Sequence, residues 1–126
     1  MGFKFGKSSL ERLSKCDMRL NALCQRMLER SDFDLTVTCG YRGKEEQEKA
    51  FDEGKSKAHF GQSKHNSLPS KAVDICPYPI NWDKKDPRWY QMVALAYDCA
   101  RELNIKIRCG AFFSFQDFPH IQLEDD

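Results

Sequence analysis

Apolar residues recur at two different spacings along this chain, and the order of the two spacings limits how it can fold. The first stretch has helical spacing, with leucine and methionine side chains three or four positions apart up to about residue 29. Ser8 and Glu11 form an S-x-x-E pattern, which predicts that a helix begins there. Asp17 predicts a second helix start after a break near Cys16. We therefore expect helical core material in the N-terminal quarter of the chain.

Further along the chain, strand spacing and helical spacing follow one another. Residues 34–39 place their apolar side chains on one side and two threonines on the other, which is typical of a strand. Pro77 is expected to end a later strand, because proline cannot donate to a strand ladder. The other expected elements are a polar helix at 44–53, a polar loop at 55–70, a strand at 71–76, a helix from Asp86 and Pro87 to about 103, and strands at 105–109 and 119–123.

This order of elements lacks the regular βαβ alternation of a parallel sheet, and no glycine-rich phosphate loop accompanies it. The sequence therefore predicts an α+β fold, in which helices pack on a small, mostly antiparallel sheet. The chain has 126 residues, which is enough for one compact domain and too short for two. We expect a single compact domain that spans residues 1–126.

Charge and composition exclude several classes of partner. Lys and Arg number 20 against 19 Asp and Glu, so the net charge of +1 gives no overall electrostatic case for nucleic acid. No stretch approaches the roughly 18 apolar residues of a membrane span, and residues 1–10 lack the apolar run of a signal peptide. We expect a protein made in the cytoplasm. The six cysteines form no C-x-x-C pair, which favours reduced, buried thiols.

Asp74 stands out because it interrupts the apolar strand at 71–76. A carboxylate in such a strand is costly to bury unless it is paired or bound to a metal ion. Alternation places Asp74 on the face opposite Val73 and Ile75. A half-exposed strand with a solvated aspartate is the alternative interpretation of this segment.

The chain has only three histidines, and two of them lie in dense polar contexts. His65 follows Ser63 and Lys64, and His120 follows a proline at the start of the last strand. Two histidines, one carboxylate such as Asp74 and a water molecule make up a catalytic zinc site. His59 is expected to be a surface residue of the loop.

Two further residues complete this hypothesis. Asp117 precedes His120 by three residues in a turn with a proline, so it is the candidate general base. Arg42 follows the strand at 34–39 and is the candidate partner for a developing oxyanion. Spacing alone favours a plain surface arginine at this position.

Several short motifs occur together in this chain. They are Ser9-Leu10-x-Arg12-Leu13, Thr38-Cys39-Gly40-Tyr41-Arg42, Glu46-Gln47, Ser63-Lys64-His65-Asn66, Pro69-Ser70-x-Ala72-Val73-Asp74, Pro77-Tyr78-Pro79 and Asp117-x-Pro119-His120. The combination covers nearly the whole chain and resembles the zinc D-Ala-D-Ala carboxypeptidase and VanY-like peptidase family. The most similar branch is that of phage endolysins that cut between L-Ala and D-Glu in the stem peptide of bacterial peptidoglycan.

This resemblance implies a zinc metallopeptidase that hydrolyses the L-Ala–D-Glu bond by means of a zinc-bound water. It also implies a fold like that of the Hedgehog signalling domain and the D-Ala-D-Ala peptidases. The residues implied for the site are the zinc ligands His65, Asp74 and His120, the general base Asp117, the substrate and transition-state clamp Arg42, and the cleft residues Ser63 and Gln47.

The resemblance further implies peptidoglycan as the partner. With no separate wall-binding domain expected, affinity for the wall must come from the catalytic cleft. An endolysin without a signal peptide needs a membrane-permeabilising partner, a holin, to reach the wall. We expect a monomer that neither inserts into membranes nor binds nucleic acid.

The chain departs from the family pattern at three places. His65 and Asp74 are nine positions apart, a longer loop than in many relatives. Gln122 stands where relatives often carry an acid, and a glutamine lacks the charge that strengthens a histidine ligand, so we expect weaker metal binding. Cys109 begins a Cys-Gly-Ala sequence where relatives have Trp-Gly-Gly, and a thiolate from Cys39 or Cys109 is an alternative metal ligand.

Three other functions remain open on sequence alone. A D-Ala-D-Ala carboxypeptidase would use the same site. A non-catalytic cell-wall-binding module would keep the fold and lose the reaction, although the presence of Asp117 argues against it. A structural or signalling domain without metal would require the two histidines and Asp74 to lie apart.

Overall fold

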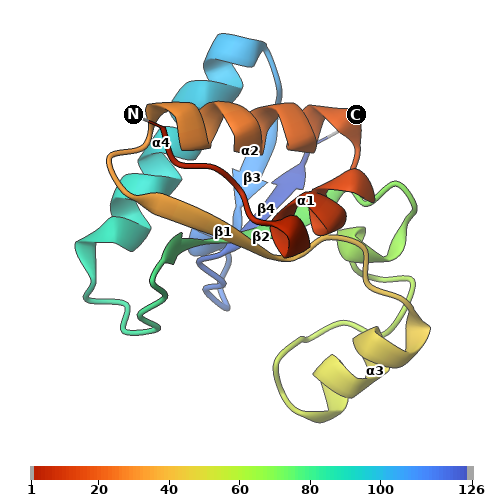
Figure 1. The fold of residues 1–126 in the computed structure, drawn as a ribbon. Helices are drawn as coiled ribbons and strands as arrows, with labels where there is room; N and C mark the ends of the chain where they lie inside the picture. The colour runs from red at the N-terminus through yellow and green to blue at the C-terminus, as the bar shows by residue number, and fades with distance from the viewer. Residues whose placement is uncertain (1, 125–126) are drawn as a thin grey trace.

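The structure, a computed structural model, describes residues 2–124, so that three residues of the predicted domain 1–126, namely Met1, Asp125 and Asp126, lie outside the described residues. The described part contains four α-helices and a four-stranded sheet of order β1-β2-β4-β3, in which all neighbouring strands are antiparallel (Figure 1). This confirms the predicted α+β class. The elements are α1 (Lys7–Ser14), α2 (Met18–Arg30), β1 (Asp34–Cys39), α3 (Lys44–Asp52), η1 (Lys64–Asn66), β2 (Ala72–Tyr78), α4 (Pro87–Leu103), β3 (Ile107–Cys109), η2 (Gly110–Phe112) and β4 (His120–Leu123).

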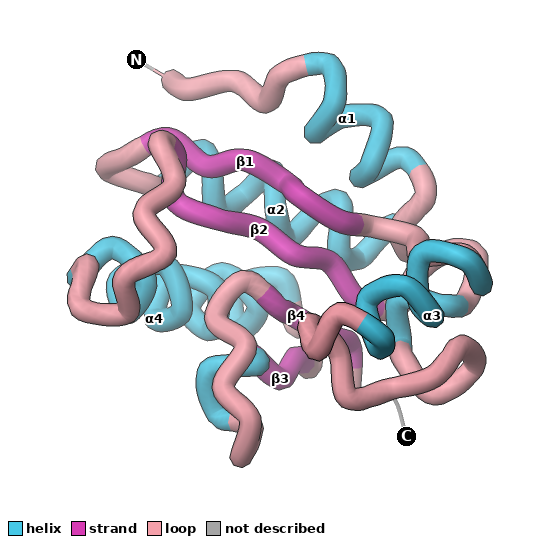
Figure 2. The backbone as a smooth tube through the Cα atoms, turned by 90° about the horizontal axis from the view of Figure 1, so that it is seen from below, coloured by secondary structure: helices cyan, strands magenta, loops and turns pink. Residues whose placement is uncertain are grey.

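The helices are distributed unevenly over the sheet. Helices α2 and α4 contact each other and the central strand β2, and they lie behind the strands when the molecule is seen from below (Figure 2). Helix α1 contacts β1, whereas α3 projects away from the sheet in a lobe of its own (Figure 1). The face of the sheet that α2 and α4 leave uncovered is therefore available for a functional site.

The apolar side chains of the helices and strands form one core between the sheet and the helices. From α4, the core receives the side that the sequence predicted, namely Trp89, Met92, Val93, Ala96 and Ala100. All six cysteines are free and five are buried, as predicted. Burial raises the pKa of Cys16, Cys76 and Cys109 to about 12, so these thiols stay protonated and serve as small apolar side chains. In residues 2–124, no helix combines the length and the apolar character that crossing a bilayer requires.

The two N-terminal helices differ in how they begin. Helix α1 begins at Lys7 after Gly6, with no side-chain cap, so the prediction that Ser8 caps it is wrong. The Ser9 hydroxyl instead accepts a hydrogen bond from Val37 of β1 at 3.0 Å, which ties the helix to the sheet. Helix α2 begins as predicted, because the Asp17 carboxylate accepts from the backbone N–H of Arg19 at 2.9 Å.

Strand β2 continues through Pro77 to Tyr78, so the prediction that Pro77 ends the strand is wrong. The N–H of Ile75 points toward the β4 side, where it donates to Pro119 at 2.9 Å. The nitrogen of Pro77, two residues on, faces the same side. Strand β4 pairs with β2 only as far as Asp74, so this proline removes no ladder hydrogen bond.

The third strand is shorter than expected. Helix α4 ends in Asn104, which adopts the left-handed conformation with φ of 58°, and Ile105 still donates to Ala100 of the last helical turn at 2.8 Å. Residues 105 and 106 therefore belong to the helix exit, and β3 begins at Ile107.

Candidate functional site

The three residues predicted as metal ligands meet on the face of the sheet opposite α2 and α4. Asp74 of β2 and His120 of β4 are direct partners in the strand register, so their side chains project from the same face. Val73 and Ile75, on either side of Asp74, point into the core and are fully buried. His65 arrives from the short η1 turn and is also buried. The strand register therefore determines the positions of Asp74 and His120, and η1 positions His65 beside them.

The three side chains converge on a small triangle of atoms. His65 Nε2 lies 3.1 Å from Asp74 Oδ1 and 3.2 Å from His120 Nδ1, and the third side, from His120 Nδ1 to Asp74 Oδ1, is 3.4 Å. Ligands about 2.0–2.1 Å from a tetrahedral metal ion lie about 3.3–3.4 Å from one another. The spacing of the triangle therefore suits one such ion.

In each of the two histidines, the outer ring nitrogen, which points away from Asp74, already has a hydrogen-bond partner. His65 Nδ1 lies 2.7 Å from the carbonyl oxygen of Gly40, and His120 Nε2 lies 2.9 Å from Oε1 of Gln122. Each of these oxygens only accepts, so each outer nitrogen carries the proton and donates. When both rings are neutral, their unprotonated nitrogens then face Asp74, which is the orientation that metal-binding histidines need.

Three electron-rich atoms this close repel one another unless a proton or a cation lies among them. Burial disfavours the charged form of His65, but the carboxylate of Asp74 outweighs it and raises the pKa of His65 to about 10. Burial likewise disfavours the charge on Asp74, but the two histidines hold the pKa of its carboxyl well below the usual range. In the absence of metal, a proton on His65 thus holds the triangle together.

Asp117, the candidate general base, stands beside this triangle. Its backbone donates to Gly110 at 2.9 Å and accepts from His120 at 3.1 Å, so the turn before β4 is fixed at both ends. Its Oδ2 lies 4.0 Å from His120 Nδ1, and its side chain is 42% exposed. Burial, followed by the negative charge of Asp74, raises the pKa of Asp117. A carboxylate with these properties can exchange protons with a substrate in the open space before it.

Arg42 is not the solvated surface residue that spacing alone favours. Its guanidinium donates to Oε1 of Gln47 at 3.0 Å and lies 3.7 Å from Oδ2 of Asp74. Its backbone N–H donates to the carbonyl oxygen of His65 at 2.8 Å. The guanidinium is thereby fixed at the edge of the site with a positive charge toward the cleft.

The two residues expected to line the cleft with Arg42 behave differently. Ser63 lines the cleft, and its hydroxyl accepts from the backbone N–H of His65 at 3.2 Å. Gln47 is fully buried, so the expectation that it lines the cleft is wrong. Its amide donates to Ser56 Oγ at 2.9 Å and to the carbonyl oxygen of Ala58 at 2.7 Å. Gln47 therefore joins Arg42 to the segment that follows α3.

Sequence reasoning gave no role to Asn66, which follows His65 directly. Its amide donates to the carbonyl oxygen of Arg42 at 3.0 Å and to Oε1 of Gln47 at 3.1 Å. Its own oxygen accepts from the backbone N–H of Gly61 and of Ser63. Four hydrogen bonds from one side chain thus hold the loop that carries His65. The signal in the sequence was a polar residue next to a ligand.

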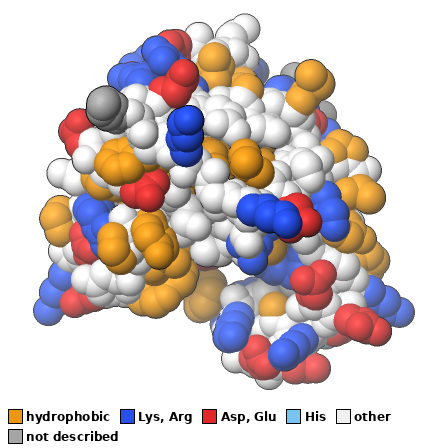
Figure 3. Space-filling view, in the orientation of Figure 1, with side chains coloured by type: hydrophobic (Ala, Val, Ile, Leu, Met, Phe, Trp, Pro, Cys, Tyr) orange, Lys and Arg blue, Asp and Glu red, His pale blue; other side chains and the backbone are white. Residues whose placement is uncertain are grey.

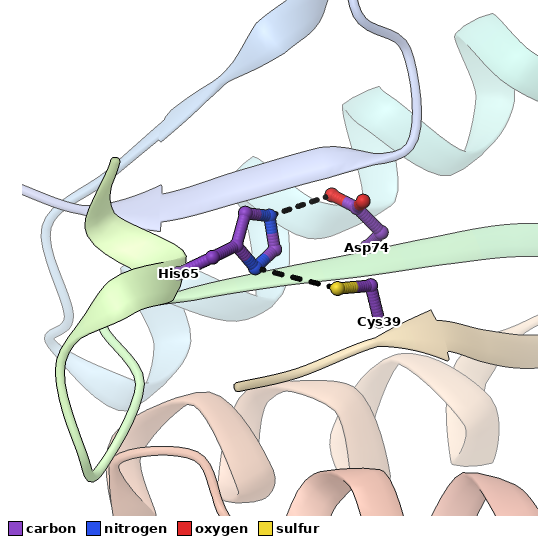
Figure 4. Close-up of side chains that lie close together, drawn as sticks. All are labelled: Cys39, His65 and Asp74. Carbon is purple, nitrogen blue, oxygen red and sulfur yellow. Dashed lines mark hydrogen bonds and ion pairs between the residues drawn. The ribbon is translucent and has the colours of Figure 1, made fainter. Parts of the chain in front are cut away.

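Neither of the two cysteines considered as ligands lies beside the histidine nitrogens that face Asp74. His65 lies between Asp74 and Cys39, whose Sγ is 3.8 Å from Nδ1, the outer nitrogen of the ring (Figure 4). Cys39, His65 and Asp74 do form a group in which each residue offers a ligand atom within 4.8 Å of the others. Cys109 is fully buried in the core. His59 lies outside the triangle, as expected, and is 54% exposed beside Glu48.

A cleft of about 820 Å³ opens in front of the triangle. It lies between the lobe that contains α3 and the body of the molecule, where the space-filling view shows a hollow (Figure 3). Its walls contain aromatic rings, namely Trp82, Trp89, Phe113, Phe115 and Phe118. They also contain cations, namely Arg42, Lys55, Lys57, Lys64 and Lys84. Such a cleft suits an extended, anionic ligand.

Comparison with known proteins places this architecture in a family. The sequence model of the phage L-alanyl-D-glutamate peptidases matches residues 1–123. The chain belongs to that family. An alignment of 128 positions with the L-alanyl-D-glutamate peptidase of Escherichia phage T5 shows 33% identity and covers 98% of this chain and 91% of the phage T5 protein.

A solved structure supports the same assignment to the L-alanyl-D-glutamate peptidases. The crystal structure of the Serratia marcescens L-Ala D-Glu endopeptidase ChiX matches with a TM-score of 0.80 at 25% identity, covering 96% of this chain and 90% of ChiX. Family and fold therefore agree with the resemblance that the motifs indicated.

In this member of the family, Gln122 links His120 to a carboxylate by hydrogen bonds. The histidine donates to Gln122 Oε1, and the amide nitrogen of Gln122 donates to Glu124 Oε2 at 2.9 Å. Lys64 lies 3.5 Å from the same oxygen of Glu124. The acid that is missing at position 122 is thus present one hydrogen bond further away, which the motif alone did not reveal.

Proposed function

We propose that this chain is a zinc-dependent peptidoglycan peptidase of the endolysin type, which hydrolyses the L-Ala–D-Glu bond of the stem peptide. The zinc ligands are His65, Asp74 and His120. One observation carries the proposal, namely that two imidazole lone pairs and a carboxylate oxygen converge at 3.1–3.4 Å. Two histidines and one carboxylate are a donor set that catalytic zinc takes in peptidases.

The residues around the triangle have separate tasks in this reaction. When bound, zinc polarises a carbonyl oxygen and lowers the pKa of a water molecule to about 7. Asp117 accepts the proton of the attacking water and donates it to the leaving amine. Because the pKa of Asp117 is raised, it lies closer to neutral pH, and a group with such a pKa can both accept and donate a proton efficiently. Arg42 stabilises the negative charge that develops on the scissile carbonyl oxygen.

Gln47 and Asn66 act through Arg42 rather than on the substrate. Both side chains lie within hydrogen-bond distance of Arg42 atoms, and the two are joined to each other. They restrict the conformations of the guanidinium before the substrate binds. Less conformational entropy is then lost when Arg42 stabilises the negative charge of the transition state. Ser63, on the wall of the cleft, is left to contact the peptide.

The proposed place of action is the bacterial cell wall. The family is named for an L-alanyl-D-glutamate peptidase activity, and that dipeptide occurs in peptidoglycan stem peptides. The chain acts there as a monomer, and the cleft supplies affinity for the wall. It reaches the wall after a holin has permeabilised the membrane.

Mass spectrometry of digested peptidoglycan tests the proposal. Purified sacculi are incubated with the zinc-loaded protein, with chelator-stripped protein and with stripped protein to which zinc is restored. We expect new free amines on D-Glu in the first and third samples only. Release of free D-Ala instead would identify a D-Ala-D-Ala carboxypeptidase. Protein that sediments with the wall but releases no peptide would identify a binding module.

A further inference from the structure

Two lysines approach the cleft from opposite sides. Lys57 lies in the segment that follows α3, and Lys84 lies in the connection between β2 and α4. Figure 1 shows the lobe with α3 at lower right and this connection at lower left. Between them lies the loop that joins η2 to β4, which carries Asp117. Both lysines line the same cleft as Asp117.

Each lysine rests on an aromatic ring of that central loop. The ammonium of Lys57 lies 4.9 Å from the centre of the Phe115 ring, and that of Lys84 lies 5.7 Å from the centre of the Phe118 ring. A ring face attracts a cation without neutralising it. The two contacts therefore hold the ammonium groups at the cleft and leave their charge available.

These two lysines differ in this respect from their neighbours in the cleft. Lys55 lies 3.2 Å from a carboxylate oxygen of Glu53, and Lys64 lies 3.5 Å from one of Glu124. Among residues 2–124, no carboxylate lies within ion-pair distance of Lys57 or Lys84. Both are exposed, and their charges can pair with an anion from outside the chain.

The proposed substrate supplies such anions, and this step rests on the proposed function. Once D-Glu is joined to L-Ala through its amine, it has two carboxyl groups and needs only one to continue the chain. A free carboxylate therefore lies next to the scissile bond, and the C-terminus of the peptide supplies another. Asp74 and Asp117 would repel these charges, so cations are needed along the cleft.

We infer that Lys57 and Lys84 are two carboxylate-binding residues, which hold an anionic peptide across the cleft with one carboxylate on either side of Asp117. One lysine binds the free carboxylate of D-Glu, and the other binds the carboxylate at the C-terminal end. Together they set the preference for an acidic residue after the scissile bond. Neither residue takes part in the proton transfers.

Binding of uncleavable peptides to the zinc-loaded full chain tests this inference. The probes are three L-Ala–D-Glu tetrapeptide analogues in which a methylene group replaces the scissile carbonyl. One has both carboxylates free, one is amidated at the D-Glu carboxylate, and one is amidated at the C-terminus. Calorimetry gives the dissociation constants for the wild type, Lys57→Met, Lys84→Met and the control Lys85→Met, which changes an exposed lysine outside the cleft. Methionine keeps the length of an exposed side chain and removes its charge.

We expect each of the first two variants to bind the doubly charged analogue about five- to tenfold more weakly than the wild type. Each should also become insensitive to amidation of one carboxylate, a different one for each lysine. Lys85→Met should match the wild type, because Lys85 is exposed and does not line the cleft. The inference is wrong if either variant keeps wild-type affinity, or if it weakens all three analogues equally.

The same experiment separates this inference from the proposed function. Hydrolysis of the corresponding natural peptide by the wild type is measured in parallel. If the wild type does not cleave it, the proposed function fails, but the dissociation constants still decide the role of the lysines. If the wild type cleaves it and the variants bind normally, only the inference about the lysines fails.

Discussion

Asp74 shows how the surroundings of one residue determine its chemistry. It is flanked in β2 by two fully buried apolar side chains, and a lone carboxylate there would carry a large desolvation cost. Two imidazoles within 3.4 Å and the guanidinium of Arg42 at 3.7 Å offset that cost. The two histidine nitrogens and the carboxylate oxygen repel one another at these distances, so a proton or a metal ion between them is needed to stabilise the arrangement.

The proposed role of Asp117 leads to a first prediction at this scale. In Asp117→Asn, the side chain keeps its shape but can no longer accept the proton of the attacking water. We expect kcat to fall by about 10²–10⁴-fold. The zinc content and the thermal midpoint should stay close to those of the wild type, because Asp117 is outside the triangle.

Rates on a synthetic stem peptide, together with metal analysis of the same samples, check this expectation. His120→Ala serves as the comparison, since it should lose zinc and activity together. A variant Asp117→Asn that hydrolyses the peptide at the wild-type rate would remove Asp117 from the role of general base.

Gln122 leads to a second prediction. A glutamate at this position would accept the proton of His120 Nε2 directly and with a full charge, which strengthens the histidine as a ligand. We expect Gln122→Glu to bind zinc about tenfold more tightly. Glu124→Gln should weaken zinc binding by a smaller factor, since it acts through the amide of Gln122. Competition with a chromophoric chelator measures both affinities. Equal affinity in all three proteins would mean that the hydrogen bonds behind His120 do not affect the metal.

The sequence was a good guide to some residues of the site and a poor guide to others. Asp74 and His120 could be placed because strand alternation is local and a charge in an apolar strand is conspicuous. Gln47 could not, because its burial depends on the segment after α3 folding back over it. Glu124 could not either, because its contact runs through another side chain. Contacts of this kind depend on tertiary structure and leave no local signal.

At the scale of elements, Gly110 at the start of η2 fixes the approach of the catalytic turn. A Cβ at this position would collide with the carbonyl oxygen of Asp117 and would lie 2.9 Å from Cβ of His120. The Gly110 carbonyl also accepts from the backbone N–H of Asp117 at 2.9 Å. The turn between η2 and β4 therefore packs against a bare backbone.

We predict that Gly110→Ala displaces this turn and lowers both activity and stability. The expected loss of stability is about 1–3 kcal/mol, as for other overpacked sites. Urea unfolding and peptide hydrolysis measure the two effects. Gly6→Ala is the matched control, because a Cβ there meets no atom within 4 Å. If Gly110→Ala retains full activity, then the position of the turn is not critical for catalysis.

The start of α2 leads to a prediction about pH. A hydrogen bond from Arg19 is the main cause that holds the pKa of Asp17 well below its usual range, and Lys71 lies 3.2 Å away. Since the pKa is lower in the folded state, the stabilisation is present above about pH 4 and is lost as the pH falls. Asp17→Asn keeps the helix cap but removes the charge. We expect it to cost about 1–2 kcal/mol at pH 7 and less at pH 2, because the stabilisation declines only as the pH falls from about 4 toward the lowered pKa of folded Asp17.

Urea unfolding at the two pH values checks this, with the exposed Asp32→Asn as the control. A cost that is the same at pH 2 and pH 7 would show that the charge of Asp17 is not responsible.

Most elements could be predicted from the sequence, and the exceptions have physical causes. Asp17 and Asp86 cap their helices as expected, because a cap is a local hydrogen bond. Ser8 does not, because Ser9 is recruited by β1 and the helix begins earlier. Pro77 is tolerated within a strand only because β4 is short, and the length of a neighbouring strand cannot be read from the proline itself.

At the scale of the whole molecule, the proposed metal ligands join segments that are far apart in the sequence. His65 comes from a loop held by Asn66, Asp74 from the centre of the sheet, and His120 from the last strand. A metal ion that binds only the folded state stabilises it by an amount that grows with metal concentration, about 2.7 kcal/mol at 100 times the dissociation constant. Removal of the metal should therefore lower the thermal midpoint of the whole domain.

The last prediction is that this stabilisation depends on pH. Without metal, His65 carries a proton at neutral pH, because Asp74 raises its pKa to about 10. The metal needs the same nitrogen unprotonated, so binding releases this proton. The apparent affinity should then rise about tenfold per pH unit between pH 6 and 8, and the gain in stability should rise by about 1.4 kcal/mol per unit.

Thermal unfolding of zinc-loaded and stripped protein at pH 6, 7 and 8 measures the gain, and calorimetry in two buffers of different ionisation enthalpy counts the protons released. Asp74→Asn is the informative variant, because it removes the charge that raises the pKa of His65. It should bind zinc more weakly and release fewer protons at neutral pH. If the wild type binds zinc with the same affinity at pH 6 and pH 8, then no proton occupies the triangle of ligand atoms in the metal-free protein.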